Sequence, residues 1–254
     1  AQAEIKQFEL CQYRIGRTSW DECQTFYYNP NSTYFFLQEQ IRKPFFQKKW
    51  EANKIEKHTV FCAGGYRSPL KGAHKVLEAI ALLRDEFPDI CVRIPGKNIY
   101  DINCKFGYNK YLCNLINKLG LREVVQFLGD LSANQMAEEF SKAHLCVIGS
   151  SIENSSNTLG EAFCVGTPCV VPYVGGLPSL AKDEEDVLFY RFGEIEQMAW
   201  QIRRVLRDQN LAVKLSNNSR ERAKKQYNSD EISNNLVLIY EKVLFNQKSK
   251  DEFL

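Results

Sequence analysis

From residue 59 onward, short apolar runs alternate with segments of helical periodicity, and this alternation limits the possible folds. Six runs have the length and composition of buried strands: TVFCAGG, CVRIPG, VVQFLG, LCVIGS, PCVVPY and VLFY. In the first helix-sized segment between them, Val76, Ile80, Leu83 and Phe87 recur at helical spacing. Strands joined by helical crossovers form a parallel sheet with helices on both faces. We therefore predict an α/β fold, a Rossmann-like doubly wound parallel sheet.

The two ends of the chain differ from this central region. Residues 1–54 are rich in aromatic side chains but contain only two strand candidates, around 13–18 and 34–37, which are too few for an independent α/β domain. From about residue 195 the pattern is almost wholly helical, and we expect Trp200 to lie on a buried helix face. The predicted division is an N-terminal segment, 1–54, a sheet domain, 55–229, and a C-terminal helix, 230–254.

Charge and hydropathy argue against several kinds of partner. The 33 basic and 31 acidic residues leave a formal charge of +2, which gives no electrostatic case for binding nucleic acid. No apolar run approaches the roughly 20 residues that cross a bilayer, and the first ten residues lack the pattern of a signal peptide. We expect a cytoplasmic protein without a transmembrane segment, in which any anion site is local.

The cysteines and histidines suggest structural roles. Nine cysteines are an odd number without a Cys-x-x-Cys pair, and those inside strand candidates should be reduced core residues; they are Cys62, Cys91, Cys146 and Cys169. The three histidines lack metal-ligand spacing; they are His58, His74 and His144. We interpret the acidic run 182–186 as a solvated turn.

The loop after the first strand of the predicted sheet has the features of an anion site. Ligands of open parallel sheets bind beyond the carboxyl ends of the strands, and this loop, GGYRSPLKG at 64–72, directly precedes a helix. Glycines such as Gly65 let the backbone approach a ligand, while Arg67 and Lys71 place cations beside a helix N-terminus. We predict a phosphate or diphosphate site, against the alternative of a tight turn with solvated cations. Neither the Walker pattern nor the Gly-x-Gly-x-x-Gly fingerprint is present.

A second loop, GSSIENSSNTLGEAFCVGTP at 149–168, places two carboxylates near the start of a predicted helix. Glu153 lies in the loop and Glu161 in the first turns of the helix. Free N–H groups around Asn157, Thr158 and Leu159 would offer a second anion contact, and the carboxylates can accept hydrogen bonds from sugar and ribose hydroxyls. The alternative is ordinary helix N-terminal chemistry, in which acidic residues are simply favoured.

Together the two loops resemble glycosyltransferase family 4, a retaining family with the GT-B fold. The resemblance covers about residues 59–190, and its motifs occur in order, each after a predicted strand: PLKG at 69–72, SSIE ending in Glu153, LGEA with Glu161, GTPCVV at 166–171 and VGGLPSL at 174–180. Counting back from Lys71, the family's usual Arg position holds Tyr66, and Arg67 stands one place late. Ser179 and Gly149 replace the usual Glu and Pro.

The resemblance implies that this is the second, nucleotide-sugar-binding domain of a GT-B glycosyltransferase. Lys71 and Arg67 would bind the donor diphosphate, Glu161 the ribose and Glu153 the transferred sugar, with Lys71, Arg67 and Glu153 as the catalytic group. The donor site would be completed by Gly65, Tyr66, Asn157, Thr158 and Leu159. The cations would replace a divalent metal, so no metal or other cofactor is implied.

The start of the chain also resembles the end of the first GT-B domain in bacterial polysaccharide-type members, through IGRTSWDE at 15–22 and YFFLQEQIR at 34–42. This implies that most of an acceptor-binding domain is absent and that helix 230–254 crosses back to it. The acceptor would be a sugar, a lipid-linked molecule or another group in polysaccharide or glycoconjugate synthesis. Peripheral contact with the inner membrane face would occur through the absent domain.

Two other functions stay open at this point. One is a non-catalytic nucleotide-sugar-binding or regulatory module, which would use the same donor contacts without transferring a sugar. The other is a nucleotide-dependent oxidoreductase, which the missing dinucleotide fingerprint disfavours.

Overall fold

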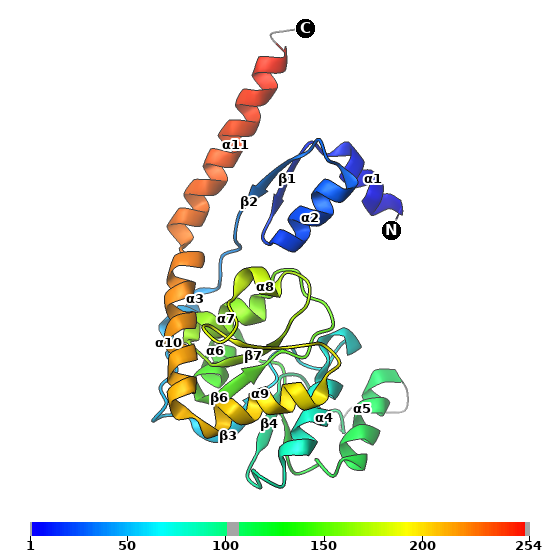
Figure 1. The fold of residues 1–254 in the computed structure, drawn as a ribbon, viewed down its shortest axis with the longest axis vertical. Helices are drawn as coiled ribbons and strands as arrows, with labels where there is room; N and C mark the ends of the chain where they lie inside the picture. The colour runs from blue at the N-terminus through cyan, green and yellow to red at the C-terminus, as the bar shows by residue number, and fades with distance from the viewer. Residues whose placement is uncertain (1, 101–106, 252–254) are drawn as a thin grey trace. The chain divides into compact units, whose positions relative to one another are not determined.

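The computed structural model describes residues 2–100 and 107–251, which form two compact units (Figure 1). The larger one, called here the sheet unit, comprises residues 41–223. The smaller one, called the terminal unit, combines the described residues up to 40 with those from 224 onward.

The sheet unit is built on six parallel strands in the order β5-β4-β3-β6-β7-β8. The strands are β3 (Glu56–Phe61), β4 (Cys91–Ile94), β5 (Val125–Phe127), β6 (Ala143–Val147), β7 (Cys169–Pro172) and β8 (Leu188–Tyr190). Each overlaps one of the six apolar runs. The direction of winding reverses between the neighbours β3 and β6, which makes this pair the topological switch point of a doubly wound sheet. The predicted Rossmann-like fold is confirmed.

Helices of the sheet unit cover both faces of the sheet (Figure 1). They are α3 (Lys43–Gln47), α4 (Ala73–Leu83), α5 (Gly107–Lys118), α6 (Ala133–Lys142), α7 (Asn157–Val165), α8 (Leu177–Leu180) and α9 (Ile195–Arg207), together with α10 (Gln209–Gln226), which continues into the terminal unit, and the short 3₁₀ turn η1 (Pro69–Lys71). Helices α4 and α9 pack together, while α3, α6 and α7 pack on one another. Right-handed crossovers that run in opposite directions from the switch point place these two groups on opposite faces.

The sequence patterns explain where these helices form and which side they bury. Helix α6 starts after Ser132, whose side chain accepts a hydrogen bond from the Gln135 N–H in a capping box. Helix α9 buries Ile202 and Val205, but Trp200 is 53% exposed. The prediction for Trp200 was wrong because it precedes Ile202 by two positions, which is about 200° around a helix, on the opposite face.

Residues 41–54, which the sequence groups with the N-terminal segment, instead belong to the sheet unit. Phe45 is fully buried and meets Phe140 edge-on, with 6.0 Å between the ring centroids. Trp50 donates its Nε1–H to Ala143 O at 2.8 Å and its backbone N–H to Val165 O at 2.9 Å. Two large aromatic side chains therefore anchor this segment on the sheet unit.

The cysteines in the strands behave mainly as core residues. Cys62, Cys146 and Cys169 are buried free thiols as predicted, whereas Cys91 is a free thiol that is only half-buried. Burial raises the pKa of the Cys62 thiol to about 12. Cys104 lies outside the described residues.

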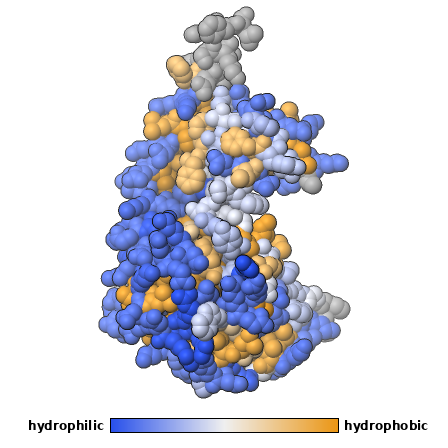
Figure 2. Space-filling model, viewed as in Figure 1, coloured by the Kyte–Doolittle hydropathy of each residue, from blue (hydrophilic) through white to orange (hydrophobic). Residues whose placement is uncertain are grey.

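The terminal unit pairs two short strands with three helices: α1 (Gln2–Leu10), β1 (Tyr13–Gly16), α2 (Ser19–Tyr28), β2 (Thr33–Phe36) and α11 (Ser229–Asp251). The strands β1 and β2 form a two-stranded parallel sheet. Several apolar side chains stay exposed, including Ile15 at 47%, Phe36 at 59% and Leu238 at 59%, and Figure 2 shows apolar surface on this unit. A sheet of two strands buries too little surface to be stable by itself.

No helix in residues 2–100 and 107–251 combines the length and hydropathy needed to cross a membrane.

Candidate functional site

The loops that carry the predicted site residues follow β3 and β6 and are pressed together at two glycines. A Cβ atom on Gly149 would lie 2.7 Å from Gly72 O and 3.0 Å from a methyl group of Val76. The Ser151 N–H also donates to Leu70 O at 2.8 Å, which joins the two loops a second time. Position 149 therefore requires glycine, because the backbone of the loop after β3 occupies the space that a side chain would need.

Lys71 and Glu153 form an ion pair across these two loops. Lys71 Nζ donates to Glu153 Oε1 at 2.5 Å, and Ser150 Oγ donates to the same oxygen at 2.6 Å. The loop after β7 meets them as well, because the Gly176 N–H donates to the Glu153 backbone oxygen at 2.9 Å. The Lys71 side chain is 40% exposed and that of Glu153 is 11% exposed. Three loops thus hold one accessible cation against one carboxylate at the switch point.

Glu161 lies on α7 and is only 7% exposed. Arg42, which directly precedes α3, donates from Nη2 to Glu161 Oε1 at 2.5 Å. Burial raises the pKa of Glu161, and the ion pair with Arg42 opposes this shift. Glu161 therefore lies beside the crevice as predicted, but its cationic partner was not predicted.

The N-terminus of α7 offers backbone donors beside the two carboxylates. The helix begins at Asn157, and the Gly160 N–H makes the first bond of the helix, to Ser156 O at 3.1 Å. The N–H groups of Asn157, Thr158 and Leu159 precede that bond and so have no acceptor within the helix. The Leu159 side chain is buried, so this residue could contact an anion only through its backbone N–H group.

Arg67 lies apart from the Lys71–Glu153 pair, in an ion pair with Asp130. The two side chains, 77% and 55% exposed, border a hollow of about 490 Å³ beyond the ends of β3, β4 and β5. The lining residues are Ala63, Gly64, Gly65, Arg67, Pro95, Gly96, Asp130, Leu131 and Met136. The two predicted cations therefore belong to different pairs at the same edge of the sheet.

Gly65 lines this hollow, and the Tyr66 ring lies against Gly96, another lining residue. Tyr66 is 4% exposed, packs edge-on to Phe127 with 5.4 Å between the ring centroids, and donates its hydroxyl hydrogen to Lys97 O. Gly65 has a φ of +67° and lies so near Pro95 O that a Cβ would be 3.2 Å away. The Tyr66 ring is thus a packing group.

Three polar residues of this edge were not predicted. Ser150 stands three positions before Glu153, and Asp130 follows β5 as Lys71 follows β3, so the rule that ligands bind at carboxyl ends of strands could have identified both. Arg42 is 119 positions from Glu161, and no local pattern marks it.

The acidic run 182–186 forms a turn that is exposed at residues 182–185, as the sequence indicates, but its last residue is buried. Asp186 is 4% exposed and accepts hydrogen bonds from the Lys182 N–H at 2.9 Å and from Arg222 Nε at 2.6 Å. The buried carboxylate is neutralised by a side chain from α10, which makes the turn a structural element. In the described part of the chain, no group of three His, Cys, Asp or Glu side chains is arranged to hold a metal ion.

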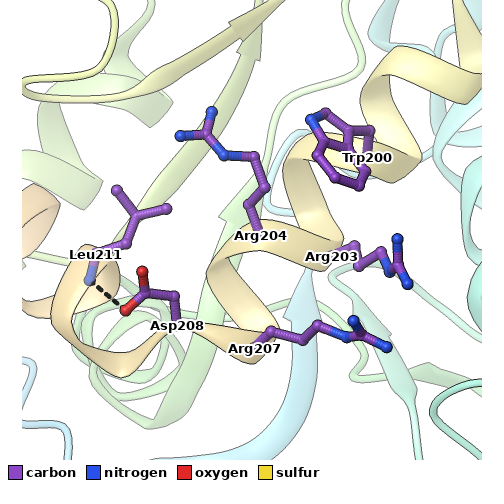
Figure 3. A pocket seen from close by; sticks show the side chains of 6 residues that line it. All are labelled: Trp200, Arg203, Arg204, Arg207, Asp208 and Leu211. Carbon is purple, nitrogen blue, oxygen red and sulfur yellow. Dashed lines mark hydrogen bonds between the residues drawn. The ribbon is translucent and has the colours of Figure 1, made fainter.

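A second hollow, of about 250 Å³, lies at the corner between α9 and α10 (Figure 3). Its lining consists of Trp200, Arg203, Arg204, Arg207, Asp208 and Leu211. Arg203 and Arg207 pair with Glu86, and Arg204 pairs with Glu184. Each of these arginines thus already has a carboxylate partner, and none of the predicted site residues lines the hollow.

Residues 44–222, more than half of the chain, match the sequence profile of the family described as Glycosyl transferases group 1. An uncharacterized glycosyltransferase of Methanocaldococcus jannaschii is 32% identical over 130 residues, which are 51% of this chain and 33% of that protein. The MMP alpha-(1->4)-mannosyltransferase of Mycolicibacterium hassiacum is 27% identical over 177 residues, which are 69% of this chain and 41% of that protein. The matched regions thus span less than half of the length of these relatives.

Solved structures share the fold at low sequence identity. Sucrose-phosphate synthase from Thermosynechococcus elongatus superposes with a TM-score of 0.80 at 19% identity, over 96% of this chain and 61% of that one. Anabaena HepE, solved with UDP-glucose, has a TM-score of 0.77 at 17% identity, over 95% of this chain and 66% of that one. The parallel sheet with flanking helices therefore matches GT-B glycosyltransferase structures.

Proposed function

The chain belongs to the glycosyl transferases group 1 family, and from this premise we propose that it forms the donor-binding half of a retaining glycosyltransferase. The enzyme would transfer a sugar from a nucleotide sugar to an acceptor. The observation that carries the proposal is the Lys71–Glu153 pair at the switch point of the sheet, the place where ligands of open α/β sheets bind.

Lys71 is proposed to stabilise the leaving diphosphate. As the glycosidic bond breaks, the bonding electron pair stays on the diphosphate oxygen, and a preorganised cation is most effective where that charge develops. Lys71 is accessible and already fixed by Glu153. The N–H groups of Asn157, Thr158 and Leu159 would add donors, and the charge of Lys71 would stand in place of a divalent metal. Arg67 would add a weaker contact from the adjacent hollow.

The two carboxylates are proposed to select the rest of the donor. Glu153 would accept hydrogen bonds from hydroxyls of the transferred sugar, and Glu161 from the ribose. A buried ionised carboxylate rejects a ligand that lacks the matching hydroxyl, because its acceptor would then be left unpaired. Gly65 and the Tyr66 backbone would let the nucleotide approach the sheet closely.

The relatives indicate the class of donor and acceptor. One is named as a mannosyltransferase, and a structure with the same fold was solved with UDP-glucose. We propose a hexosyl nucleotide as donor and, as acceptor, a sugar, a lipid-linked molecule or another group of polysaccharide or glycoconjugate synthesis. This reaction would occur in the cytoplasm, at the inner membrane face where the acceptor is lipid-linked.

The terminal unit is proposed to be the tail of the acceptor-side domain, to which α11 would cross back. Within the described residues its sheet has two strands, and exposed apolar side chains such as Phe36 lie on β2. Further strands and helices of an acceptor domain would cover such a surface. Peripheral membrane contact would then belong to that domain.

Binding and turnover test the proposal separately. A thermal-shift screen of this chain against UDP-, GDP- and ADP-sugars should give stabilisation by at least one of them. The full-length enzyme should then transfer the sugar with retention and remain active in EDTA. Stabilisation without turnover in the full-length enzyme would favour a non-catalytic nucleotide-sugar-binding module, and no stabilisation by any of the three classes would contradict the donor site.

A further inference from the structure

The segment that carries Arg42 is fixed to α7 at several points. Phe45 and Trp50 anchor it as described above, and Arg220 Nη1 donates both to Lys48 O at 3.0 Å and to Val165 O, at the end of α7, at 3.1 Å. Arg42 directly precedes α3, and its guanidinium carbon lies 5.1 Å from the Phe45 ring centroid. Arg42 is therefore held beside Glu161 by packing as well as by charge.

The charge balance around Glu161 depends on Arg42. The ionisable groups that face the carboxylate are Arg42 from the segment before α3, Cys146 from β6 and Cys164 from α7, with Arg220 of α10 beside Cys164. The two thiols are themselves buried, and burial raises the pKa of each, so they stay neutral and do not change the charge around the carboxylate. Arg42 is thus the cation that offsets the cost of an ionised carboxylate in this buried position.

The Arg42–Glu161 pair keeps hydrogen-bonding capacity for a ligand. Among the described residues, Arg42 is the side chain that donates to Glu161, and it uses Oε1, so Oε2 keeps its capacity to accept a hydrogen bond. The Arg42 side chain is 58% exposed and carries five N–H donors in a planar group. The pair therefore presents Glu161 Oε2 as an acceptor next to the charged N–H donors of Arg42. Two neighbouring hydroxyl groups, as in a vicinal diol, could bind both.

We propose that Arg42 is a specificity residue of the donor site, which positions Glu161 and keeps it charged so that the site prefers ribose to 2′-deoxyribose. This inference rests on the proposed function, because it assigns Glu161 to the ribose. Arg42 acts through Glu161, and for this reason its loss should change the selectivity for the nucleotide sugar ring rather than the affinity for the diphosphate.

The test is calorimetric titration of the chain with UDP, GDP and ADP and with their 2′-deoxy counterparts, at pH 6 and pH 8. The wild-type chain should bind at least one ribonucleotide about tenfold more tightly than its 2′-deoxy form, as expected for one lost hydrogen bond to a charged group. Arg42→Met should lower this ratio, and more at pH 6 than at pH 8, because burial alone then raises the pKa of Glu161 without the opposing ion pair. Arg42→Lys, which keeps the charge, should retain more of the ratio than Arg42→Met.

Two controls separate this role from a structural one. Lys48→Met removes another cation of the same segment, whose pair with the exposed Glu138 has the same 2.5 Å length, and should leave the ratio unchanged. Glu161→Gln should lower the ratio, and adding Arg42→Met to it should lower it no further, because both substitutions remove one coupled interaction.

Distinct results overturn the inference and the function on which it rests. An Arg42→Met chain that keeps the wild-type ratio at both pH values, or that loses affinity for both sugar forms equally, overturns the role of Arg42 while the donor site stands. Failure of the wild-type chain to bind any of the six nucleotides overturns the donor site and this inference together.

Discussion

The β3–β6 strand pair has two chemically different ends. At the amino end, the His58 N–H donates to His144 Nδ1 at 3.2 Å, the two rings lie parallel with 6.0 Å between centroids, and Phe87 packs edge-on to His58 at 5.0 Å. Burial lowers the pKa of His144 to about 4, so this residue is neutral at pH 7. His58 pairs with the exposed Asp89 at 2.6 Å.

At the carboxyl end the same two strands lead into loops that hold opposite charges. Lys71 meets Glu153 and remains 40% exposed, while Arg42 meets Glu161 and remains 58% exposed. The amino end stabilises the fold by burying the neutral His144, whereas the carboxyl end keeps cations within reach of a ligand. The comparison predicts that changes at one end alter stability, and that changes at the other alter binding and catalysis.

The largest effect is expected at the carboxyl end, for Lys71→Ala. In the full-length enzyme, kcat should fall by about 10²–10³-fold, as for other single donors to a developing oxyanion. The free energy of unfolding of the chain should change by less than about 1 kcal/mol, because the pair is partly exposed. Steady-state kinetics and urea unfolding measure the two quantities.

Lys48→Ala is the matched control, since Lys48 and Glu138 form an ion pair of the same 2.5 Å length elsewhere on the sheet unit. It should leave kcat within about twofold of the wild-type value, in line with the small energies of exposed pairs. A Lys71→Ala enzyme as active as the Lys48→Ala enzyme would remove the distinction between the two ends.

The next largest effect is expected at the amino end, where acid should lower the free energy of unfolding. The pKa of His144 is about 4 in the folded chain against an ordinary value of 6.5, so between these pH values the unfolded chain binds a proton that the folded chain does not. Stability should therefore be complete above about pH 6.5 and decrease as the pH falls towards 4, by on the order of 3 kcal/mol.

Urea unfolding across this range should show that His144→Gln flattens the pH dependence relative to the wild-type chain, while Lys71→Ala leaves it unchanged. The groups that face His144 are His58, Lys57 and the Val205 carbonyl, none of which changes in either variant. Identical slopes for the wild-type and His144→Gln chains would mean that the amino end does not act through this residue.

Gly149→Ala should lower both the free energy of unfolding and the affinity for nucleotide, because the new Cβ would lie 2.7 Å from Gly72 O. Pushing the loops apart should cost about 1–3 kcal/mol of unfolding free energy, as in other overpacked sites, and weaken nucleotide binding. Gly64→Ala is the stability control, since its Cβ would meet Lys71 at an ordinary 3.8 Å. Equal stability of the two variants would show that the loops are not locked at this contact.

The smallest effect is expected for Arg67→Ala. The Arg67–Asp130 pair is 77% and 55% exposed, so its removal should leave the unfolding free energy nearly unchanged and lower nucleotide affinity by at most about fivefold. Calorimetric titration of the Arg67→Ala and Lys71→Ala chains with the same nucleotide compares the two losses of affinity. A larger loss for Arg67→Ala than for Lys71→Ala would reverse the assignment of the principal cation.

The sequence predicts the sheet and its active edge well because both depend on local patterns. Each apolar run contains or overlaps a strand, and the two loops selected for their glycines and charges do meet, as the Lys71–Glu153 pair shows. Parallel connections bring the carboxyl ends of all strands to one edge, so the position of a loop after a strand already determines where its side chains lie.

The remaining features depend on contacts between distant residues. Arg42 reaches Glu161 across 119 positions. Asp186, the buried end of an otherwise exposed run, pairs with Arg222 of α10. Tyr66 occupies a position where the resembled family has a cation, yet its ring is a packing group beneath Gly96. These contacts arise from tertiary packing between distant residues, which cannot be predicted from local patterns in one sequence.

A crystal structure of this chain grown with UDP, GDP or ADP tests the central claim most directly. The account predicts the diphosphate within about 3 Å of Lys71 Nζ and of the N–H groups of Asn157–Leu159, as is usual for charge-assisted hydrogen bonds, with the ribose at Glu161. A nucleotide bound instead in the hollow beside Trp200, or bound while the diphosphate leaves Lys71 uncontacted, would contradict it.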